Sequence, residues 1–148
     1  MTKGNSLQRI LVPVDGSETA VRAVDYALHL ARGSRGPVEL HLLTVQPPIV
    51  SGGVRMFFKH EEIEAYYQDS GQEALRAARE QLDKAGQAYV QHVRVGPIGE
   101  TIVAYANEKH CDHIVMGSRG LGAISGMVLG SAATKVIHLA DVPVTLVK

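Results

Sequence analysis

The stretch that decides the fold class is HIVMGSRGLGAISGMVLGS, which runs from His113 to Ser131. Its first four residues form a short apolar run that predicts a buried strand, and a helical pattern follows from about Ser125 to Leu139. A glycine-rich loop lies between them. A strand, a glycine loop and a helix in this order favour phosphate binding, because glycines let backbone N–H groups approach an anion and a helix N-terminus adds a partial positive charge.

The rest of the chain alternates between strand and helix patterns. Besides the run at 113–116, short apolar runs bounded by turn residues predict strands at 9–14, 38–45 and 143–147, and alternation at Val93 and Val95 predicts a strand at 89–95. Apolar residues at helical spacing predict a helix from Ser17 or Glu18 to about Gly33, and further helices at 61–85, 100–109 and 125–139. The segment 46–60 is predicted to be a loop, because two prolines and two glycines interrupt it.

Strands that alternate with helices predict a parallel sheet with helices on both faces. We therefore expect five strands and four helices in a single-domain, doubly wound α/β fold over residues 1–148. In such sheets, ligands bind beyond the carboxyl ends of the strands, where the strand order reverses. Asp15 and Gly117 follow the first and fourth strands, so these two turns meet at that point if the two strands are neighbours.

Three segments of the chain carry a resemblance to a known family. The spacing Gly-x2-Gly-x9-Gly-Ser at 117–131 resembles the nucleotide-binding signature of the universal stress protein family, in its ATP-binding branch. The opening ILVPVDGS at 10–17 and the closing VPVTLV at 142–147 resemble that family's first strand with its acidic turn and its last strand. The resemblance implies an adenine-nucleotide α-hydrolase-like sheet with the strand order 3-2-1-4-5.

The same resemblance implies an adenine nucleotide as the ligand, either ATP or AMP or ADP. The phosphates are expected on the backbone N–H groups of Gly117, Ser118, Arg119, Gly120, Gly130, Ser131 and Ala132, with the Arg119 guanidinium and the Ser131 hydroxyl adding contacts. Asp15 matches the family's acidic residue near the nucleoside. The base is expected in an apolar slot formed by Pro13, Val14, Thr44, Val45 and Met116. A Mg²⁺ ion bound through the phosphates is compatible with this site, because Mg²⁺ uses few protein ligands.

Each of these features also has a plainer interpretation. The glycine loop also fits a structural turn rich in small residues, Asp15 is a common helix cap or turn residue, and Arg119 also fits a solvated loop arginine. Two other phosphate motifs are excluded: no lysine follows a glycine as a P-loop requires, and the glycines at 120–126 do not match the dinucleotide spacing. We expect no metal at His110 and His113, because one ends a helix and the other begins a strand.

The residues do not form a recognisable catalytic group. The chain has no Gly-x-Ser-x-Gly elbow and no convincing carboxylate pair. We therefore expect a nucleotide-dependent stress-response or regulatory module with little or no turnover. The alternative is a slow ATPase, or a self-phosphorylating or adenylate-handling enzyme of the same fold, which would use hydroxyls near the phosphates such as Ser118, Ser125, Ser131 and Thr134. A third alternative acts through protein contacts without a nucleotide.

Composition limits the location and the partners. The 148 residues have a formal net charge of zero, so nothing indicates the basic surface that nucleic-acid binding requires. The chain has neither a signal peptide pattern nor an apolar run long enough for a membrane span, and its one cysteine, Cys111, excludes an internal disulfide. We expect a cytoplasmic protein with no membrane and no nucleic-acid partner.

Two further segments indicate contacts. Both phenylalanines of the chain lie in Met56-Phe57-Phe58, which predicts a lid over the nucleotide, a docking patch, or the apolar start of the long helix. The last strand is at a sheet edge in the implied order, and exposed edges pair with other chains. In the resembling family this strand pairs across a two-fold axis, so we expect a homodimer through Val144, Thr145, Leu146 and Val147. The alternative is an edge covered by the N-terminal tail.

Overall fold

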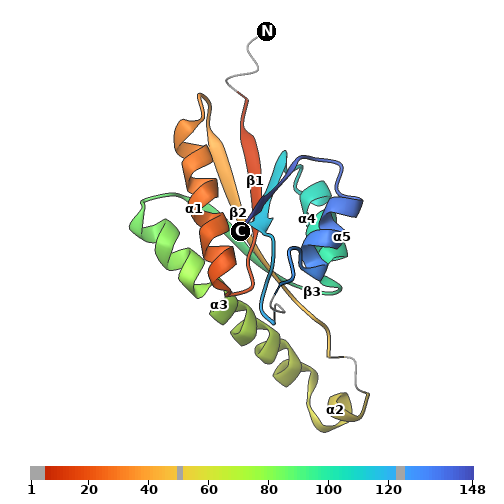
Figure 1. Ribbon diagram of the computed structural model, residues 1–148. Coiled ribbons are helices and arrows are strands. Elements are labelled where there is room, and N and C mark those ends of the chain that lie inside the picture. Colours follow the sequence, from red (N-terminus) through yellow and green to blue (C-terminus); the bar gives the residue numbers. More distant parts are fainter. Residues whose placement is uncertain (1–5, 50–51, 123–125) are drawn as a thin grey trace.

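The computed structural model describes residues 6–49, 52–122 and 126–148, and its centre is a five-stranded parallel sheet in the order β3-β2-β1-β4-β5 (Figure 1). The strands are β1 (Gln8–Pro13), β2 (Val38–Gln46), β3 (Tyr89–Val95), β4 (His113–Gly117) and β5 (Val144–Val147). Each of them overlaps a predicted strand and differs at the ends by one residue at most. The fold class and the predicted strand order are confirmed.

Helices cover both faces of the sheet. They are α1 (Glu18–Gly33), α2 (Gly52–Phe57), α3 (His60–Lys84), α4 (Ile98–Glu108) and α5 (Ser131–Leu139). The first of them begins where the sequence indicates, because the Ser17 hydroxyl accepts a hydrogen bond from the Ala20 N–H at 3.2 Å and so caps the helix.

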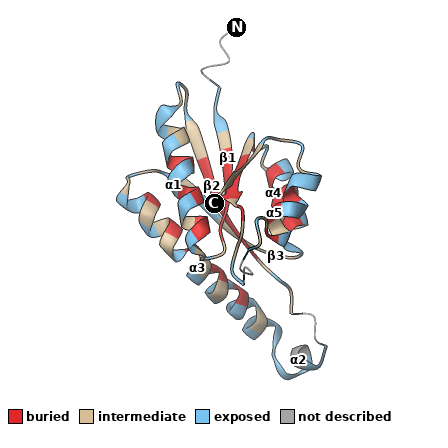
Figure 2. Ribbon diagram, viewed as in Figure 1, coloured by how far each residue is buried: buried red, intermediate tan, exposed pale blue. Residues whose placement is uncertain are grey.

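The core is divided by the sheet into two apolar clusters (Figure 2). Successive side chains of a strand point to opposite faces, so Leu40 and Leu42 of β2 pack beneath α1 and α3, whereas Leu43 and Val45 pack toward α4 and α5. Strands buried on both faces in this way read as continuous apolar runs, which is the pattern in β1, β2 and β4.

Two expectations about helices are wrong. Helix α5 begins at Ser131 and not near Ser125, which lies outside the described residues. Gly126 has φ +85°, in the left-handed region that does not continue a right-handed helix, and Gly130 is the N-cap. In the segment 46–60, expected to be a loop, the short helix α2 forms and lies at the projecting end of α3 (Figure 1).

The pairing of β1 with its two neighbours brings the ends of β1 and β4 together. β1 pairs with β2 on one side and with β4 on the other, with Ile10 opposite His113 and Leu11 opposite Ile114. The chain therefore leaves β1 and β4 at neighbouring points on the same edge of the sheet. This is the switch point at which the strand order reverses, and ligands of doubly wound sheets bind there.

Candidate functional site

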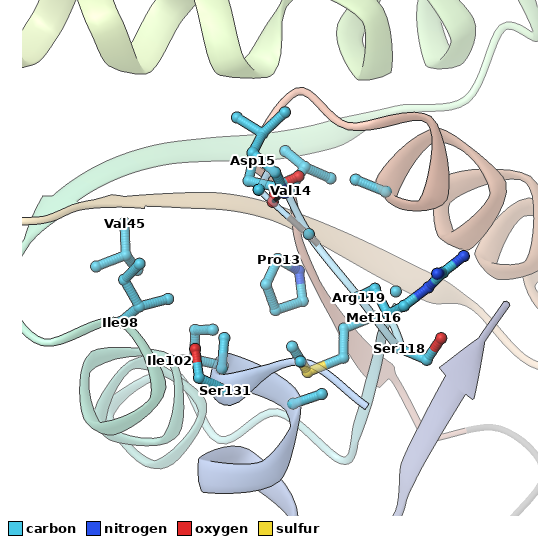
Figure 3. A pocket seen from close by; sticks show the side chains of 18 of the residues that line it. Pro13, Val14, Asp15, Val45, Ile98, Ile102, Met116, Ser118, Arg119 and Ser131 are labelled. Carbon is cyan, nitrogen blue, oxygen red and sulfur yellow. Dashed lines mark hydrogen bonds between the residues drawn. The ribbon is translucent and has the colours of Figure 1, made fainter. Parts of the chain in front are cut away.

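A cavity of about 260 Å³ lies at this edge of the sheet. It is lined by the ends of β1, β2 and β4, by the first turns of α4 and α5, and by the glycine-rich loop between β4 and α5. Val45 and Ile98 lie at one end of the pocket, Ser118 and Arg119 lie at the other, and Pro13 and Met116 lie between them (Figure 3). The volume is near the lower end of the range of small-molecule sites, roughly 300 Å³ upward.

Twelve predicted site residues line this cavity together: Pro13, Val14, Asp15, Val45, Met116, Gly117, Ser118, Arg119, Gly120, Gly130, Ser131 and Ala132. Thr44 does not line it. Its neighbours Leu43 and Val45 face the α4 side of β2, where the cavity opens, so the alternation of the strand directs Thr44 to the opposite face. Thr44 is buried, and its hydroxyl accepts a hydrogen bond from the Gln46 side chain at 3.4 Å.

The Asp15 carboxylate joins two turns of the site. Its Oδ1 accepts a hydrogen bond from the Ser17 N–H at 2.9 Å, and its Oδ2 accepts one from the Leu121 N–H at 2.9 Å. The first bond shapes the turn between β1 and α1, and the second holds the glycine loop 106 residues further along the chain. A Cβ at Gly120 would collide with this carboxylate, so only glycine permits the contact. The carboxylate therefore fixes the glycine loop against the end of β1.

Some of the predicted phosphate donors are already used within the protein. The Ser118 N–H donates to the Val147 carbonyl at 2.8 Å, and the Gly130 N–H donates to the Ser118 carbonyl at 2.7 Å. The expectation that these two amides face a ligand is therefore wrong. They tie the glycine loop to the end of β5 and to the start of α5, which positions the remaining donors.

The first turn of α5 is the best anion site in the pocket. Its N-cap is Gly130, which has no side chain to accept from the first amides of the helix. A helix leaves its first N–H groups without intrahelical partners, and these groups carry the positive end of the helix dipole. Ser131, Ala132 and Ala133 line the cavity from this turn, and the Ser131 hydroxyl adds a second kind of donor.

Several lining residues were not predicted as part of the site. Ile98 and Ile102 lie one turn apart on α4 and close the apolar end of the cavity (Figure 3). Ile102 falls within the helix expected at 100–109. A signal for both positions is their spacing of four residues at the start of a helix that follows the turn after β3. Leu121, Gly122 and Met127 also line the cavity from the long loop.

A polar cluster lies away from the pocket, on the α4 side of the sheet. The His41 ring is buried, with Nδ1 at 2.7 Å from the Tyr105 hydroxyl and Nε2 at 2.6 Å from Glu39 Oε1. The hydrogen bond from His41 lowers the pKa of Glu39, and burial raises the pKa of Tyr105. Nearby, burial raises the pKa of the Cys111 thiol to about 11, so Cys111 is a protonated core residue and no nucleophile at neutral pH.

The segment Met56-Phe57-Phe58 contacts neither the pocket nor the core. Met56 is 86%, Phe57 is 85% and Phe58 is 51% exposed, so of the three alternatives the one in which they are the apolar start of the long helix, packed on the sheet, is wrong. None of them lines the cavity in the described structure.

Among the described residues, no helix is both long and apolar enough to cross a bilayer.

Comparisons with known proteins agree with this architecture. A family model described as the universal stress protein family matches residues 6–148. Universal stress protein MJ0531 of Methanocaldococcus jannaschii is 30% identical over 145 residues, which cover 97% of this chain and 84% of the relative. The solved structure of the hypothetical protein MJ0577 is 28% identical with a TM-score of 0.80, and the alignment covers 95% of each chain.

A second solved structure adds a ligand to the comparison. It is described as a universal stress protein in complex with cAMP, is 27% identical with a TM-score of 0.70, and is aligned over 95% of this chain and 97% of its own. The family model spans nearly the whole chain, the sequence of MJ0531 is 30% identical to it, and the solved structure of MJ0577 has a similar fold. The chain therefore belongs to the universal stress protein family.

Proposed function

We propose that this protein binds an adenine nucleotide, with ATP as the principal ligand, in the cavity at the switch point. The observation that carries the proposal is the open first turn of α5, which faces a cavity whose other end is apolar. The similar protein in complex with cAMP supports the adenine nucleotide class. AMP and ADP share the nucleoside and belong to the same proposal.

The pocket suggests how the nucleotide lies. An adenine ring suits the apolar end, where Val45, Ile98 and Ile102 provide an apolar contact surface. The phosphates suit the amides of α5 together with the Arg119 guanidinium, which forms no hydrogen bond or ion pair with another described residue. A Mg²⁺ ion would be held through phosphate oxygens and water, because both oxygens of the one lining carboxylate, Asp15, already hold backbone amides.

We propose a regulatory module with little turnover. Of the hydroxyls expected near the phosphates, Ser118 is buried and Thr134 donates to the Gly130 carbonyl at 2.8 Å, while Ser125 lies outside the described residues. Ser131 remains as an acceptor for self-phosphorylation. No general base lies beside it in the described lining, so slow hydrolysis or self-phosphorylation stays the second candidate.

The test is isothermal titration of nucleotide-stripped protein with ATP and Mg²⁺, followed by product analysis after long incubation. We expect micromolar affinity with negligible ADP formation. A Cβ at Gly130 would lie 3.3 Å from the Arg119 Cα and 3.4 Å from the Ser118 carbonyl oxygen, so Gly130→Val should displace the loop and abolish binding. Unchanged ATP affinity in Gly130→Val would refute the phosphate assignment, and steady turnover would favour the enzyme.

We also propose a single domain over residues 1–148 that forms a homodimer in the cytoplasm. Among the described strands β5 is at the edge of the sheet and pairs with β4 alone, and an edge strand presents backbone N–H and C=O groups on its outer side. Pairing of Val144–Val147 with the same strand of a second chain would satisfy these groups about a two-fold axis. The free thiol of Cys111 suits a reducing compartment.

A further inference from the structure

A second cavity, a groove of about 800 Å³, lies beside the candidate nucleotide pocket along helix α3. The two cavities share Asp15, Val45, Ile98 and Leu121 as lining residues. Nothing in the proposed nucleotide mode uses the remainder of the groove. Its own residues come from the end of β2 and from one face of α3.

Helix α3 has two distinct faces. The residues that pack on the sheet are Tyr67, Gly71, Leu75, Ala78 and Leu82. The residues of this helix that line the groove lie beside them: Tyr66, Asp69, Ser70, Glu73, Ala74, Arg76 and Ala77. The second face thus forms one wall of the groove and has no partner element in the described structure over this length.

The groove is acidic on balance, because three carboxylates, those of Asp15, Asp69 and Glu73, line it together with one cation, Arg76, among its described residues. Asp69 makes no hydrogen bond or ion pair with another described residue, and Glu73 shares Arg76 with Glu80, at 3.1 Å and 3.6 Å respectively. The first half of α3, from His60 to Gly71, contains four carboxylates and no lysine or arginine, although the whole chain has a formal net charge of zero. The first half of α3 therefore carries an excess of negative charge.

We propose that this groove is the docking site for a basic, apolar segment of a partner protein. An arginine or lysine of the segment would pair with Asp69, and a second would compete with Arg76 for Glu73. Its apolar side chains would contact Tyr66, Ala74 and Ala77. A cationic segment fits because opposite charges across an interface favour the encounter and fix its register. The volume of the groove exceeds that of a single side chain, which favours an extended or helical segment.

The residues that line both cavities can couple docking of the segment to nucleotide binding. Leu121 belongs to the glycine loop and Ile98 to the apolar end of the first pocket, and both also face the groove. A change in either side chain on nucleotide binding changes the surface that the segment meets. This coupling rests on the proposed nucleotide binding, whereas the docking itself does not.

The test uses fluorescence anisotropy with a labelled peptide of about twelve residues that alternates arginine and leucine. A peptide that alternates glutamate and leucine is the control ligand. We expect the basic peptide to bind, and Asp69→Asn combined with Glu73→Gln to weaken it about tenfold or more. Glu62→Gln is the matched control, because it removes a carboxylate from the same helix outside the groove, and it should change the affinity less than about twofold.

The other outcomes overturn the proposal. Equal weakening by Glu62→Gln would mean unspecific attraction to an acidic helix. Binding of both peptides, or of neither, would refute the proposal that the groove selects a basic segment by charge. Concentration-dependent self-association that is lost in Asp69→Asn with Glu73→Gln would assign the groove to a second copy of this chain. Ala77→Lys, which places a further cation in the groove beside Arg76, should abolish peptide binding. A cooperative thermal unfolding transition like that of the wild type would confirm that this variant is folded.

Titration of the peptide with and without saturating ATP separates the two proposals. A change in peptide affinity with ATP supports the coupling. Peptide binding in a protein that fails to bind ATP would refute the nucleotide proposal and leave the docking proposal standing. Normal ATP affinity without peptide binding would refute the docking proposal and leave the nucleotide proposal standing.

Discussion

Asp15→Asn tests how the candidate site is organised. The Asp15 carboxylate accepts one hydrogen bond from the Ser17 N–H and one from the Leu121 N–H, both at 2.9 Å. Asparagine offers one oxygen, so its amide NH₂ faces the second backbone N–H and that bond is lost. A hydrogen bond to a charged group contributes about 1.5–3 kcal/mol, and we take the lower end because Asp15 is only partly buried.

This loss translates into weaker ATP binding. A glycine loop that is no longer held against β1 spends less time in the binding-competent arrangement, and the apparent dissociation constant rises in proportion. A change of about 1.4 kcal/mol corresponds to a factor of ten, so ATP affinity should fall about tenfold. Adenosine has no phosphates to place on the loop or on α5, so its affinity should change less than about twofold.

The assay is calorimetric titration of both ligands with wild-type protein, with Asp15→Asn and with the control Glu18→Gln. Glu18 begins α1 close to Asp15 and does not line the cavity, so its replacement removes a nearby charge without touching the loop. Equal losses for adenosine and ATP in Asp15→Asn would refute the reasoning, because they would show that the carboxylate binds the nucleoside directly.

Three other predictions concern packing, pH and assembly. Gly71→Ala should destabilise the protein by about 1–3 kcal/mol in urea unfolding, because the added Cβ would lie 2.5 Å from Val93 Cγ1, and Val93→Ala in the same chain should restore part of the loss. Burial lowers the pKa of His113 below its ordinary 6.5, so the unfolded chain takes up the proton more readily and stability falls as the pH drops through about 6.5. The melting temperature should therefore fall less between about pH 7.5 and about pH 5.5 in His113→Gln, whose amide can still bond Thr145, than in the wild type, and equal slopes would contradict the assignment. Single cysteine substitutions along Val144–Val147 should yield at least one variant that forms a disulfide-linked dimer on mild oxidation, read on non-reducing gels, whereas failure at all of these positions would argue against the β5 dimer.

The fold was predictable because its signals are local and repeated. Buried apolar runs that end in turn residues mark β1, β2 and β4, and Ser17 caps α1 with the side chain that the sequence suggests. The start of α5 was not predictable from spacing alone. Between Gly126 and Ser131 lie three consecutive apolar residues, Met127, Val128 and Leu129, which are as compatible with a helix as the residues that follow. Only the backbone shows that Gly126 has a positive φ and that Gly130 caps the helix.

The site was predictable to the extent that it depends on which strand ends meet. Strand order brings Pro13, Asp15 and Met116 together, and the family resemblance supplies that order. The use of individual backbone groups was not predictable. The pairing of β4 with β5 directs the Ser118 N–H to the Val147 carbonyl. The residues of the glycine loop do not indicate this hydrogen bond, because its acceptor lies near the end of the chain.

The signature glycines also have a reason within the protein itself. Gly117, Gly120 and Gly130 lack positive φ angles, so conformational freedom does not explain them. A Cβ at Gly117 would lie 2.7 Å from Thr19 Cγ2, and a Cβ at Gly120 would collide with Asp15. These glycines let the loop pack closely against α1 and the end of β1.

Close packing of the loop has a consequence for any signal that a nucleotide would send. Through Ser118 the glycine loop is bonded to the last strand at Val147, through Leu121 it is bonded to Asp15, and the same leucine lines the groove along α3. A ligand that shifts the loop therefore acts on the edge strand and on the groove at once. Proteins of this size respond to such shifts through packed contacts that have few alternative arrangements. The loop is thus the element through which nucleotide binding, assembly and partner docking would depend on one another.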